Sequence, residues 1–269
     1  MLKIACSELC LLGNPVLQNV RDLMNAGCGN IELMADGEGW DDLEGLWDRL
    51  AIELPKTGAS FSLHPAAWDI NLTSPIKELR DTAFALHEKS LAFAHKIGAS
   101  HVVLHPGFCN SSAFDKGRAR RLAREAAEKL AAKAKPLGIR LAFENVGYHG
   151  ASIYTEEEFC HALDGVDETI GYLVDTGHAH VNHWDVPALI DRLKDRLLGI
   201  HLHDNKADAD SHLPLYEGSL NWPAIFRAIR NIRGDCGLVL EYAPGTPPGR
   251  LSEGYGILAK ETMEKAPGA

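Results

Sequence analysis

The stretch KGRARRLAREAAEKLAAKAKPLGIRLAFEN, residues 116–145, contains one complete structural unit of this chain. Its first part alternates Ala and Leu with Arg, Lys and Glu at helical spacing, which predicts an amphipathic helix over residues 116–136. Pro136 and Gly138 are typical of a helix C-terminus. The apolar run from Arg140 to Glu144 is too short for a buried helix, so it predicts a strand that is covered on both faces.

The same alternation recurs along the chain. Other short apolar runs predict strands at Leu2–Cys6, Asn30–Met34, Ala59–His64, His101–His105, Gly171–Asp175, Leu198–His203 and Leu238–Glu241. Helical periodicity predicts helices at Pro15–Ala26, Asp41–Ile52, Pro75–Ile97, Thr155–Leu163, Val186–Arg196, Trp222–Ile232 and Leu251–Glu264. Eight pairs leave about 34 residues for each, which matches a strand-helix unit that crosses over to a parallel strand.

We therefore predict an α/β fold with one domain, 1–269, in the form of a single (β/α)8 TIM barrel. The usual length of such a barrel, roughly 250 residues, fits this chain. An open doubly wound sheet is the alternative. It is disfavoured because no GxGxxG motif follows the first predicted strand.

The composition argues against several classes of function. With 27 Lys and Arg against 37 Asp and Glu, the formal net charge is −10, which disfavours bulk attraction to nucleic acid or anionic lipid. No apolar run approaches the roughly 18 residues of a membrane helix. Glu8 stands where a signal peptide would be apolar. The six cysteines include no CxxC pair, so we expect neither a disulfide framework nor a zinc knuckle in a cytoplasmic protein.

Potential metal ligands stand at the ends of the predicted strands. Glu144 ends LAFE, Asp175 ends YLVD, His201 lies in GIHL and Glu241 ends LVLE. The C-terminal ends of barrel strands meet on one face, and carboxylates gathered in one buried pocket repel each other unless a cation neutralises them. We therefore predict that these four residues bind a divalent metal. Mixed oxygen and nitrogen ligands suit Mn²⁺, Zn²⁺, Co²⁺ or Fe²⁺ better than Ca²⁺.

Further polar residues are expected around the same pocket, as substrate ligands or a second metal site: His64, His105, His178, Asp210 and His212. For Glu32 or His64 considered alone, a hydrogen bond to a loop or to water is the simpler interpretation. His203 alternates with His201 along a strand, so we expect its side chain to point toward the helices and to be structural.

The motifs LHPGF, LAFENVG, YLVDTGHAH, IHLHDNK, DSHLPLYEGSLNW and LVLEY resemble the xylose isomerase-like TIM barrel superfamily. This superfamily includes sugar phosphate isomerases and epimerases and is related to endonuclease IV. In the sugar branch, the resemblance implies one divalent ion (Mn, Zn, Co or Mg) on Glu144, Asp175, His201 and Glu241. It also implies that Glu144 and Glu241 are the catalytic acid and base, and that His178 binds substrate oxygens.

The physical basis of that chemistry is proton transfer. A metal that chelates a carbonyl and its neighbouring hydroxyl stabilises an enediolate, while one carboxylate removes the adjacent proton and the other returns it. The implied function is a divalent-metal-dependent isomerase or epimerase of a keto-sugar, inosose or related polyol. A small-molecule carbohydrate is then the expected partner, and the resemblance also implies a homo-oligomer.

The endonuclease IV branch, which cleaves at abasic sites, uses three zinc ions and nine ligands. The resemblance matches all nine: His64, His105, Glu144, Asp175, His178, His201, Asp210, His212 and Glu241. However, the loops ADGEGWDD, AAWDINL and ENVGYHGASIY are neutral or acidic, which disfavours duplex DNA because a DNA enzyme needs positive charge near phosphates. We therefore predict the sugar branch, with this endonuclease and an inosose-type dehydratase as alternatives.

Some positions depart from the sugar branch. Ala207 stands where ketose 3-epimerases carry an arginine that contacts substrate, and Tyr216 replaces a glycine, which is expected to narrow the pocket. No Gly-rich phosphate cradle or Arg cluster follows the last two strands, so we expect an unphosphorylated substrate. Four aromatic residues are candidates to stack on a sugar ring or to pack in the loops: Trp68, Phe108, Tyr148 and Trp184.

Overall fold

The computed structural model describes residues 1–41, 45–111, 113–147 and 150–263. Eight parallel strands close into a barrel in sequence order, and β8 pairs with β1. The strands are β1 Leu2–Ser7, β2 Asn30–Met34, β3 Ser60–His64, β4 His101–Leu104, β5 Arg140–Glu144, β6 Ile170–Asp175, β7 Leu197–Leu202 and β8 Cys236–Leu240. The predicted (β/α)8 barrel is thereby confirmed.

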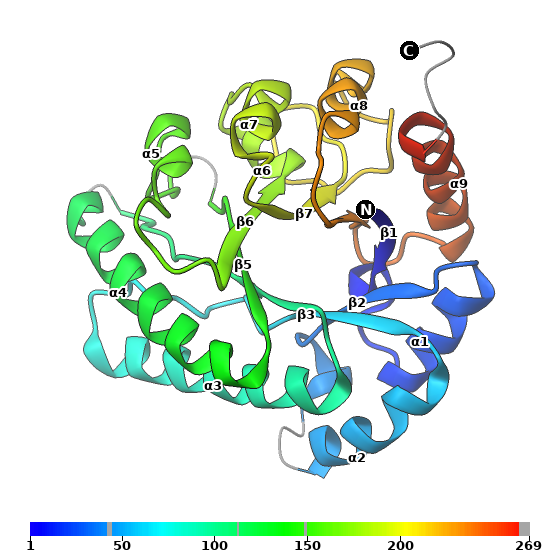
Figure 1. Ribbon diagram of the computed structural model, residues 1–269, viewed down its shortest axis with the longest axis horizontal. Helices are drawn as coiled ribbons and strands as arrows, with labels where there is room; N and C mark the ends of the chain where they lie inside the picture. The colour runs from blue at the N-terminus through cyan, green and yellow to red at the C-terminus, as the bar shows by residue number, and fades with distance from the viewer. Residues whose placement is uncertain (42–44, 112, 148–149, 264–269) are drawn as a thin grey trace.

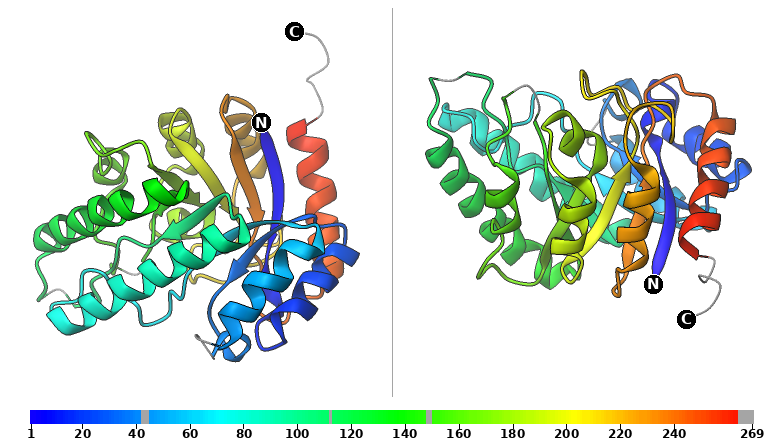
Figure 2. Two further views of the ribbon diagram at one scale, coloured as in Figure 1. Left: turned by 60° about the horizontal axis from the view of Figure 1, so that its bottom comes forward. Right: turned by 90° about the horizontal axis from the view of Figure 1, so that it is seen from above.

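Helices surround this barrel (Figure 1). They are α1 Val16–Asn25, α2 Gly45–Glu53, α3 Lys77–Ile97, α4 Lys116–Ala134, α5 Glu156–Cys160, α6 Thr176–Val181, α7 Val186–Leu193, α8 Trp222–Arg230 and α9 Pro248–Leu258. Both views of Figure 2 place β1 beside α9. Within the described ranges, no helix combines the length and hydropathy that a membrane span requires.

Shorter helical turns join these elements. They are the 3-10 turns η1 Glu8–Leu11, η2 Glu38–Trp40, η3 Leu54–Thr57 and η4 Lys135–Leu137, and the π-helical turn η5 Ala259–Met263. Two predicted helices reach beyond the described residues: residues 42–44 of the segment Asp41–Ile52, and Glu264 at the end of Leu251–Glu264.

Helix α4 shows how the pattern produces the fold. Its buried alanines, among them Ala119, Ala123 and Ala127, recur every four residues on one face, while Arg and Lys occupy the opposite face. Ala127 joins the main core, whereas Ala119 and Ala123 pack with Cys109 and Ile153 of the loops. After η4, Gly138 adopts a positive φ of 70° and ends the helical segment. The interior of the barrel is filled in part by a small apolar layer: Val103, Ala142, Leu173 and Leu198.

Helix α6 was missed by the sequence analysis. It is only six residues long and follows β6 directly, so it offers too few turns for a helical period. Its start is fixed by Asp175, whose Oδ1 accepts a hydrogen bond from the backbone N–H of His178 at 2.7 Å. The turn places His178 beside the strand end that carries Asp175.

No disulfide framework was expected, and the structure joins one pair of cysteines. Cys6 of β1 and Cys28, which lies just before β2, form a disulfide and are both buried. The two residues are 22 apart in sequence, and only the pairing of β1 with β2 brings them together, with Cys6 opposite Ile31. No short-range spacing could indicate this link. The other cysteines are free, and three of them, Cys10, Cys109 and Cys236, are buried.

Glu8 is a fully buried carboxylate in η1. Its oxygens accept hydrogen bonds from Asn19 Nδ2 at 2.8 Å, from the backbone N–H of Met34 at 3.0 Å and from Trp40 Nε1 at 3.3 Å. Burial outweighs these donors and raises the pKa of Glu8 to about 7. The ionised form is therefore disfavoured in the folded state relative to the unfolded chain.

We expect Glu8→Gln to change how stability depends on pH. Because the pKa of Glu8 is raised on folding, its contribution to stability is present below the unfolded pKa and is lost as pH rises through about 7. From pH 5 to pH 8, the unfolding free energy of E8Q should therefore rise relative to that of the wild type, by on the order of 3 kcal/mol. Urea unfolding at both pH values measures this difference. The variant Glu125→Gln, at an exposed position, serves as a control. A difference in unfolding free energy between E8Q and the wild type that does not change with pH would contradict the raised pKa of Glu8.

Candidate active site

A cavity of about 610 Å³ opens at the C-terminal ends of the strands. Of the nine site residues predicted from the sequence, seven line it: His64, His105, Glu144, His178, Asp210, His212 and Glu241. The other two, Asp175 and His201, are fully buried beside them. The strand-end convergence expected from a barrel therefore brings the predicted residues to one place.

Three of the four predicted metal ligands lie around a nitrogen atom of the fourth. Nδ1 of His201 lies 3.3 Å from Glu241 Oε2, 3.5 Å from Glu144 Oε1 and 3.7 Å from Asp175 Oδ2. All four side chains are buried. Three carboxylate oxygens and one imidazole nitrogen at such distances form a donor set that suits a divalent transition-metal ion or Mg²⁺. The chemistry of these donors fits a divalent ion, and the ligand atoms that all lie within 4.8 Å of one another here belong to two sets of three, Glu144 with Asp175 and His178, and Glu32 with His201 and Glu241.

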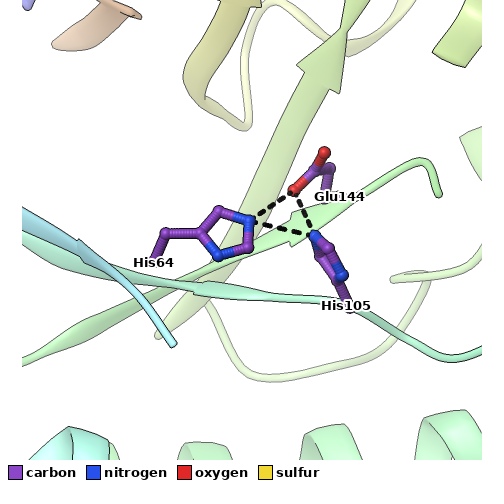
Figure 3. A group of neighbouring side chains, drawn as sticks. All are labelled: His64, His105 and Glu144. Carbon is purple, nitrogen blue, oxygen red and sulfur yellow. Dashed lines mark hydrogen bonds and ion pairs between the residues drawn. The ribbon is translucent and has the colours of Figure 1, made fainter. Parts of the chain in front are cut away.

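A second group of possible metal ligands consists of His64, His105 and Glu144 (Figure 3). Nε2 of His64 lies 3.1 Å from Nε2 of His105, which in turn lies 2.9 Å from Glu144 Oε2. Nδ1 of His64 donates to the carbonyl of Pro65 at 2.9 Å, which orients the ring with Nε2 toward this group. Two imidazole nitrogens and a carboxylate oxygen are a second set of metal donors.

A third group lies at the rim of the cavity. Oδ2 of Asp210 is 3.1 Å from His178 Nε2 and 3.3 Å from His212 Nε2. Nδ1 of His212 donates to the carbonyl of Glu241 at 3.0 Å, which orients the ring with Nε2 toward Asp210. The short polar spacing of Asp210 and His212 in the loop was a weak signal on its own. The fold brings His178 of α6 to these two residues.

The electrostatics of the site keep its carboxylates ionised. Burial alone would raise the pKa of Glu144, but the facing His105 and His201 hold it well below its usual range. In the same way, burial opposes protonation of His201, while the charges of Glu241 and Glu32 raise its pKa well above the ordinary value. Burial likewise opposes protonation of His64, and Glu144 raises the pKa of that residue to about 9. Glu144, His64 and His201 therefore stabilise each other's charged forms, whereas burial lowers the pKa of His105.

His203 corrects the sequence interpretation. It was expected to point toward the helices, yet β7 ends at Leu202, so the strand alternation no longer applies to it. Its Nε2 lies 3.0 Å from Asp175 Oδ2 and 3.1 Å from Oδ1, and its ring stacks on His212 at a centroid distance of 3.7 Å. His203 therefore orients one predicted metal ligand and supports the third group.

Gly177 makes room for His203. A Cβ atom at this position of α6 would lie 2.0 Å from His203 Cε1. We expect Gly177→Ala to displace the imidazole from Asp175, to destabilise the protein by about 1–3 kcal/mol through overpacking, and to weaken metal binding by about 10- to 100-fold. Thermal unfolding and metal titration measure the two effects. Gly256→Ala in α9, where a Cβ meets nothing within 4 Å, is the matched control. Unchanged metal affinity in G177A would contradict the role of His203.

Glu32 also differs from its expected role. A hydrogen bond to a loop or to water was the simpler interpretation. Instead its Oε1 lies 2.8 Å from His201 Nε2, on the side of the ring away from the other carboxylates. Both side chains are fully buried.

The candidate aromatic residues divide into three cases. Trp68 and Phe108 line the cavity, and they can therefore contact a ligand there. Trp184 was a poor candidate, because it packs against Phe159 at a centroid distance of 5.8 Å. Tyr148 lies outside the described residues. Tyr216 does not narrow the pocket as expected, since its half-exposed ring turns toward Trp222 and Phe226 in α8.

The loop that carries Asp210 and His212 is fixed at its base. Asp204 Oδ2 accepts a hydrogen bond from Trp222 Nε1 at 2.7 Å, and its Oδ1 accepts one from the backbone N–H of Leu220 at 3.2 Å. Asp204 also pairs with Leu213 through both backbone groups. The motif DSHLPLYEGSLNW is thus tied at Leu213, Leu220 and Trp222 to Asp204, which holds Asp210 and His212 at the rim of the cavity.

Comparisons with known proteins agree with this architecture. The sequence model of the family described as "Xylose isomerase-like TIM barrel" matches residues 20–261. An uncharacterised protein of Methanocaldococcus jannaschii is 24% identical over 222 residues, which cover 81% of this chain and 80% of that protein. A probable endonuclease 4 of Thermoplasma volcanium is 28% identical over 179 residues, covering 63% of this chain and 61% of the relative.

Solved structures share the fold. A D-tagatose 3-epimerase-like protein superposes with a TM-score of 0.83 at 18% identity, and 96% of each chain is covered. The IolI protein with a bound zinc atom gives a TM-score of 0.80 at 13% identity, with 99% of this chain and all of that chain covered. At these sequence identities, the structural similarity establishes the barrel fold.

Proposed function

Because the chain belongs to the xylose isomerase-like TIM barrel family, we propose that it is a divalent-metal-dependent isomerase or epimerase of an unphosphorylated sugar. The observation that carries this proposal is the pair of carboxylates Glu144 and Glu241. Both line the cavity, and both approach the same nitrogen of His201. The substrate class is a keto-sugar, an inosose or a related polyol.

The barrel gives the two carboxylates different positions around the substrate. Glu144 ends β5 and Glu241 follows β8, three strands further around the barrel. A molecule in the cavity can therefore meet one carboxylate on each side. This is the arrangement that a two-base proton transfer requires.

The reaction follows from these positions. One carboxylate takes the proton from the carbon next to the substrate carbonyl, and the electron pair of that C–H bond moves into an enediolate. The other carboxylate first takes up a proton from a substrate hydroxyl or from solvent and then returns it, to the opposite face for epimerisation or to the neighbouring carbon for isomerisation. A divalent ion on Glu144, Asp175, His201 and Glu241 would supply Lewis acidity for the carbonyl and the enediolate oxygens. Zinc in the IolI structure makes that ion chemically reasonable in this fold.

The cavity wall supports an unphosphorylated substrate. The described residues that line it include the carboxylates Asp69, Glu144, Asp210 and Glu241 but neither Lys nor Arg. Phosphate groups are held by cationic side chains or by backbone N–H groups at helix N-termini. Hydroxyl groups, in contrast, donate readily to carboxylates, and Trp68 and Phe108 offer apolar faces to a sugar ring.

A product screen tests this proposal. The protein is loaded with Mn²⁺, Co²⁺ or Zn²⁺, incubated with ketopentoses, ketohexoses and inososes, and the products are followed by NMR. We expect one class to give an epimer or an isomer. Loss of water from an inosose would instead assign the inosose-type dehydratase, which begins with the same proton abstraction. No product from any of these compounds would contradict the proposal.

One observation favours a second candidate, an abasic-site endonuclease of the endonuclease IV type. The second and third groups contribute His64, His105, His178, Asp210 and His212, which adds two sets of metal donors to the first. The probable endonuclease 4 of Thermoplasma volcanium is among the relatives of this chain. A count of about three zinc ions per chain, together with nicking of an abasic duplex, would support this candidate. One ion and no nicking would exclude it.

A further inference from the structure

Phe108 is an aromatic residue of the cavity wall whose backbone is held by neighbouring loops. It lies between β4 and α4, lines the cavity and is partly exposed. Trp68 also lines the cavity, but it is 56% exposed. An aromatic ring can pack against the apolar face of a sugar. Such a contact orients the sugar only if the ring has one position, which depends on the backbone that carries it.

Both backbone groups of Phe108 are hydrogen-bonded to the side chain of Asn71, which lies between β3 and α3. Nδ2 of Asn71 donates to the carbonyl of Phe108 at 2.9 Å, and the N–H of Phe108 donates to Oδ1 of Asn71 at 3.3 Å. One amide thus satisfies the acceptor and the donor of a single residue, as a neighbouring strand would. Because the two contacts need opposite ends of the amide, they also fix its orientation.

The amide of Asn71 is itself held by Thr73, a buried residue two positions further along the chain. The backbone N–H and the hydroxyl of Thr73 both donate to Oδ1 of Asn71 at 2.9 Å. These bonds leave Nδ2 free to donate to the carbonyl of Phe108. The side chain of Asn71 therefore faces Phe108 before any ligand binds.

Gly107 allows the loop after β4 to approach this amide. Its φ is 118°, a region that side chains disfavour, and a Cβ atom would lie 2.3 Å from Thr73 Oγ1 and 2.7 Å from Asn71 Oδ1. On the other side, the N–H of Cys109 donates to the carbonyl of Ala151, beyond β5, at 2.8 Å. The loop is therefore fixed between Asn71 and the loop that follows β5.

We propose that Asn71 is a positioning residue for substrate binding, which holds the ring of Phe108 in the cavity wall as the surface on which the sugar packs. The inference rests on the proposed function, in which the cavity binds a sugar. Phe108 then contacts the substrate, whereas Asn71 acts through Phe108. Neither side chain titrates, so neither can carry the substrate proton. A contact to the sugar face is present before and during proton transfer, and its loss therefore raises KM more than it lowers kcat.

A double-mutant cycle tests whether Asn71 acts through Phe108. Steady-state kinetics are measured on the metal-loaded protein with the compound that the product screen identifies. We expect Phe108→Ala and Asn71→Ala each to raise KM by about 3- to 10-fold, with kcat within about twofold of the wild type. The double variant should resemble Phe108→Ala, because Asn71 has no ring left to position.

The control for this cycle is Asn231→Ala, which removes an exposed asparagine that follows α8 and should leave KM at the wild-type value. Two outcomes would overturn the inference. One is that the effects of Asn71→Ala and Phe108→Ala on KM multiply in the double variant. The other is that Asn71→Ala lowers kcat and leaves KM unchanged.

Fluorine NMR tests the hold on Phe108 without a substrate. The protein is labelled with para-fluorophenylalanine, and the Phe108 resonance is identified by its absence from Phe108→Leu. We expect one narrow Phe108 resonance in the wild type and a shifted or broadened one in Asn71→Ala. Asn71→Asp keeps the acceptor oxygen but loses the donor to the Phe108 carbonyl, so it should show a smaller change, and it replaces Asn71→Ala if that variant fails to fold.

The two measurements separate this inference from the proposed function. A Phe108 resonance that is unchanged in the Asn71 variants that fold would overturn the inference, whatever the product screen finds. No product from any compound of the screen would instead overturn the proposed function, and with it the sugar contact of Phe108, while the fluorine spectra would still differ between the wild type and the Asn71 variants.

Discussion

Replacing Glu144 by glutamine is expected to reduce kcat by at least about 10²- to 10⁴-fold, the contribution of a positioned acid or base. Glu144 is 1% exposed, faces His105 and His201, and belongs to two groups of possible metal donors, one with His64 and His105 and one with Asp175 and His178. An amide of the same shape can neither accept the substrate proton nor supply the same negative charge to a cation. Steady-state kinetics on the substrate found in the product screen measure the loss.

Two controls isolate this effect. Glu125→Gln makes the same chemical change on the exposed surface of α4 and should leave kcat unchanged. The metal content of the Glu144→Gln variant is measured alongside, because a retained ion with lost turnover assigns the loss to proton transfer. If the loaded Glu144→Gln variant kept more than about a tenth of wild-type kcat, Glu144 would not be the acid or base.

Removing the metal is expected to abolish turnover and to lower stability together. Glu144, Asp175 and Glu241 converge on one buried point, and a bound cation offsets their mutual repulsion. At an ion concentration 100 times the Kd, binding stabilises the folded state by about 2.7 kcal/mol. For a chain of this size that corresponds to a Tm difference of roughly 5–10 °C.

The measurement compares protein treated with a chelator and protein treated with the same chelator already saturated with Ca²⁺. Only the first should lose turnover and Tm, and added Mn²⁺, Co²⁺ or Zn²⁺ should restore both. A treated protein that keeps its activity, with its Tm within about 1 °C of the control, would contradict a resident metal.

The barrel could be predicted from sequence because its signals are local. Helix α4 and strand β5 follow one another with a clear change of period and an interruption at Pro136 and Gly138, and both lie where the pattern places them. Helix α6 gave no such signal, because one turn has no measurable period and its start depends on a cap from Asp175. The Cys6–Cys28 disulfide depends on strand pairing alone.

The site was predictable to the extent that topology alone determines it. Residues at strand ends must converge in a barrel, and this placed Glu144, Asp175, His201 and Glu241 together without knowledge of any distance. The partners of those residues were not predictable. His203 lies one position past the end of its strand, and Glu32 reaches His201 across the interior of the barrel. Contacts of this kind depend on side-chain directions in three dimensions.

The central claim is that Glu144 and Glu241 move a proton at the carbon next to a substrate carbonyl. Incubation of the metal-loaded protein with its keto-sugar or inosose substrate in heavy water tests it most directly. We predict that deuterium enters at the carbon that receives the proton, which is the same carbon for epimerisation and the former carbonyl carbon for isomerisation, at least as fast as product forms, and that Glu144→Gln does not catalyse this exchange at the wild-type rate. Product formed without any incorporation of deuterium at that carbon, in a site open to solvent, would contradict it.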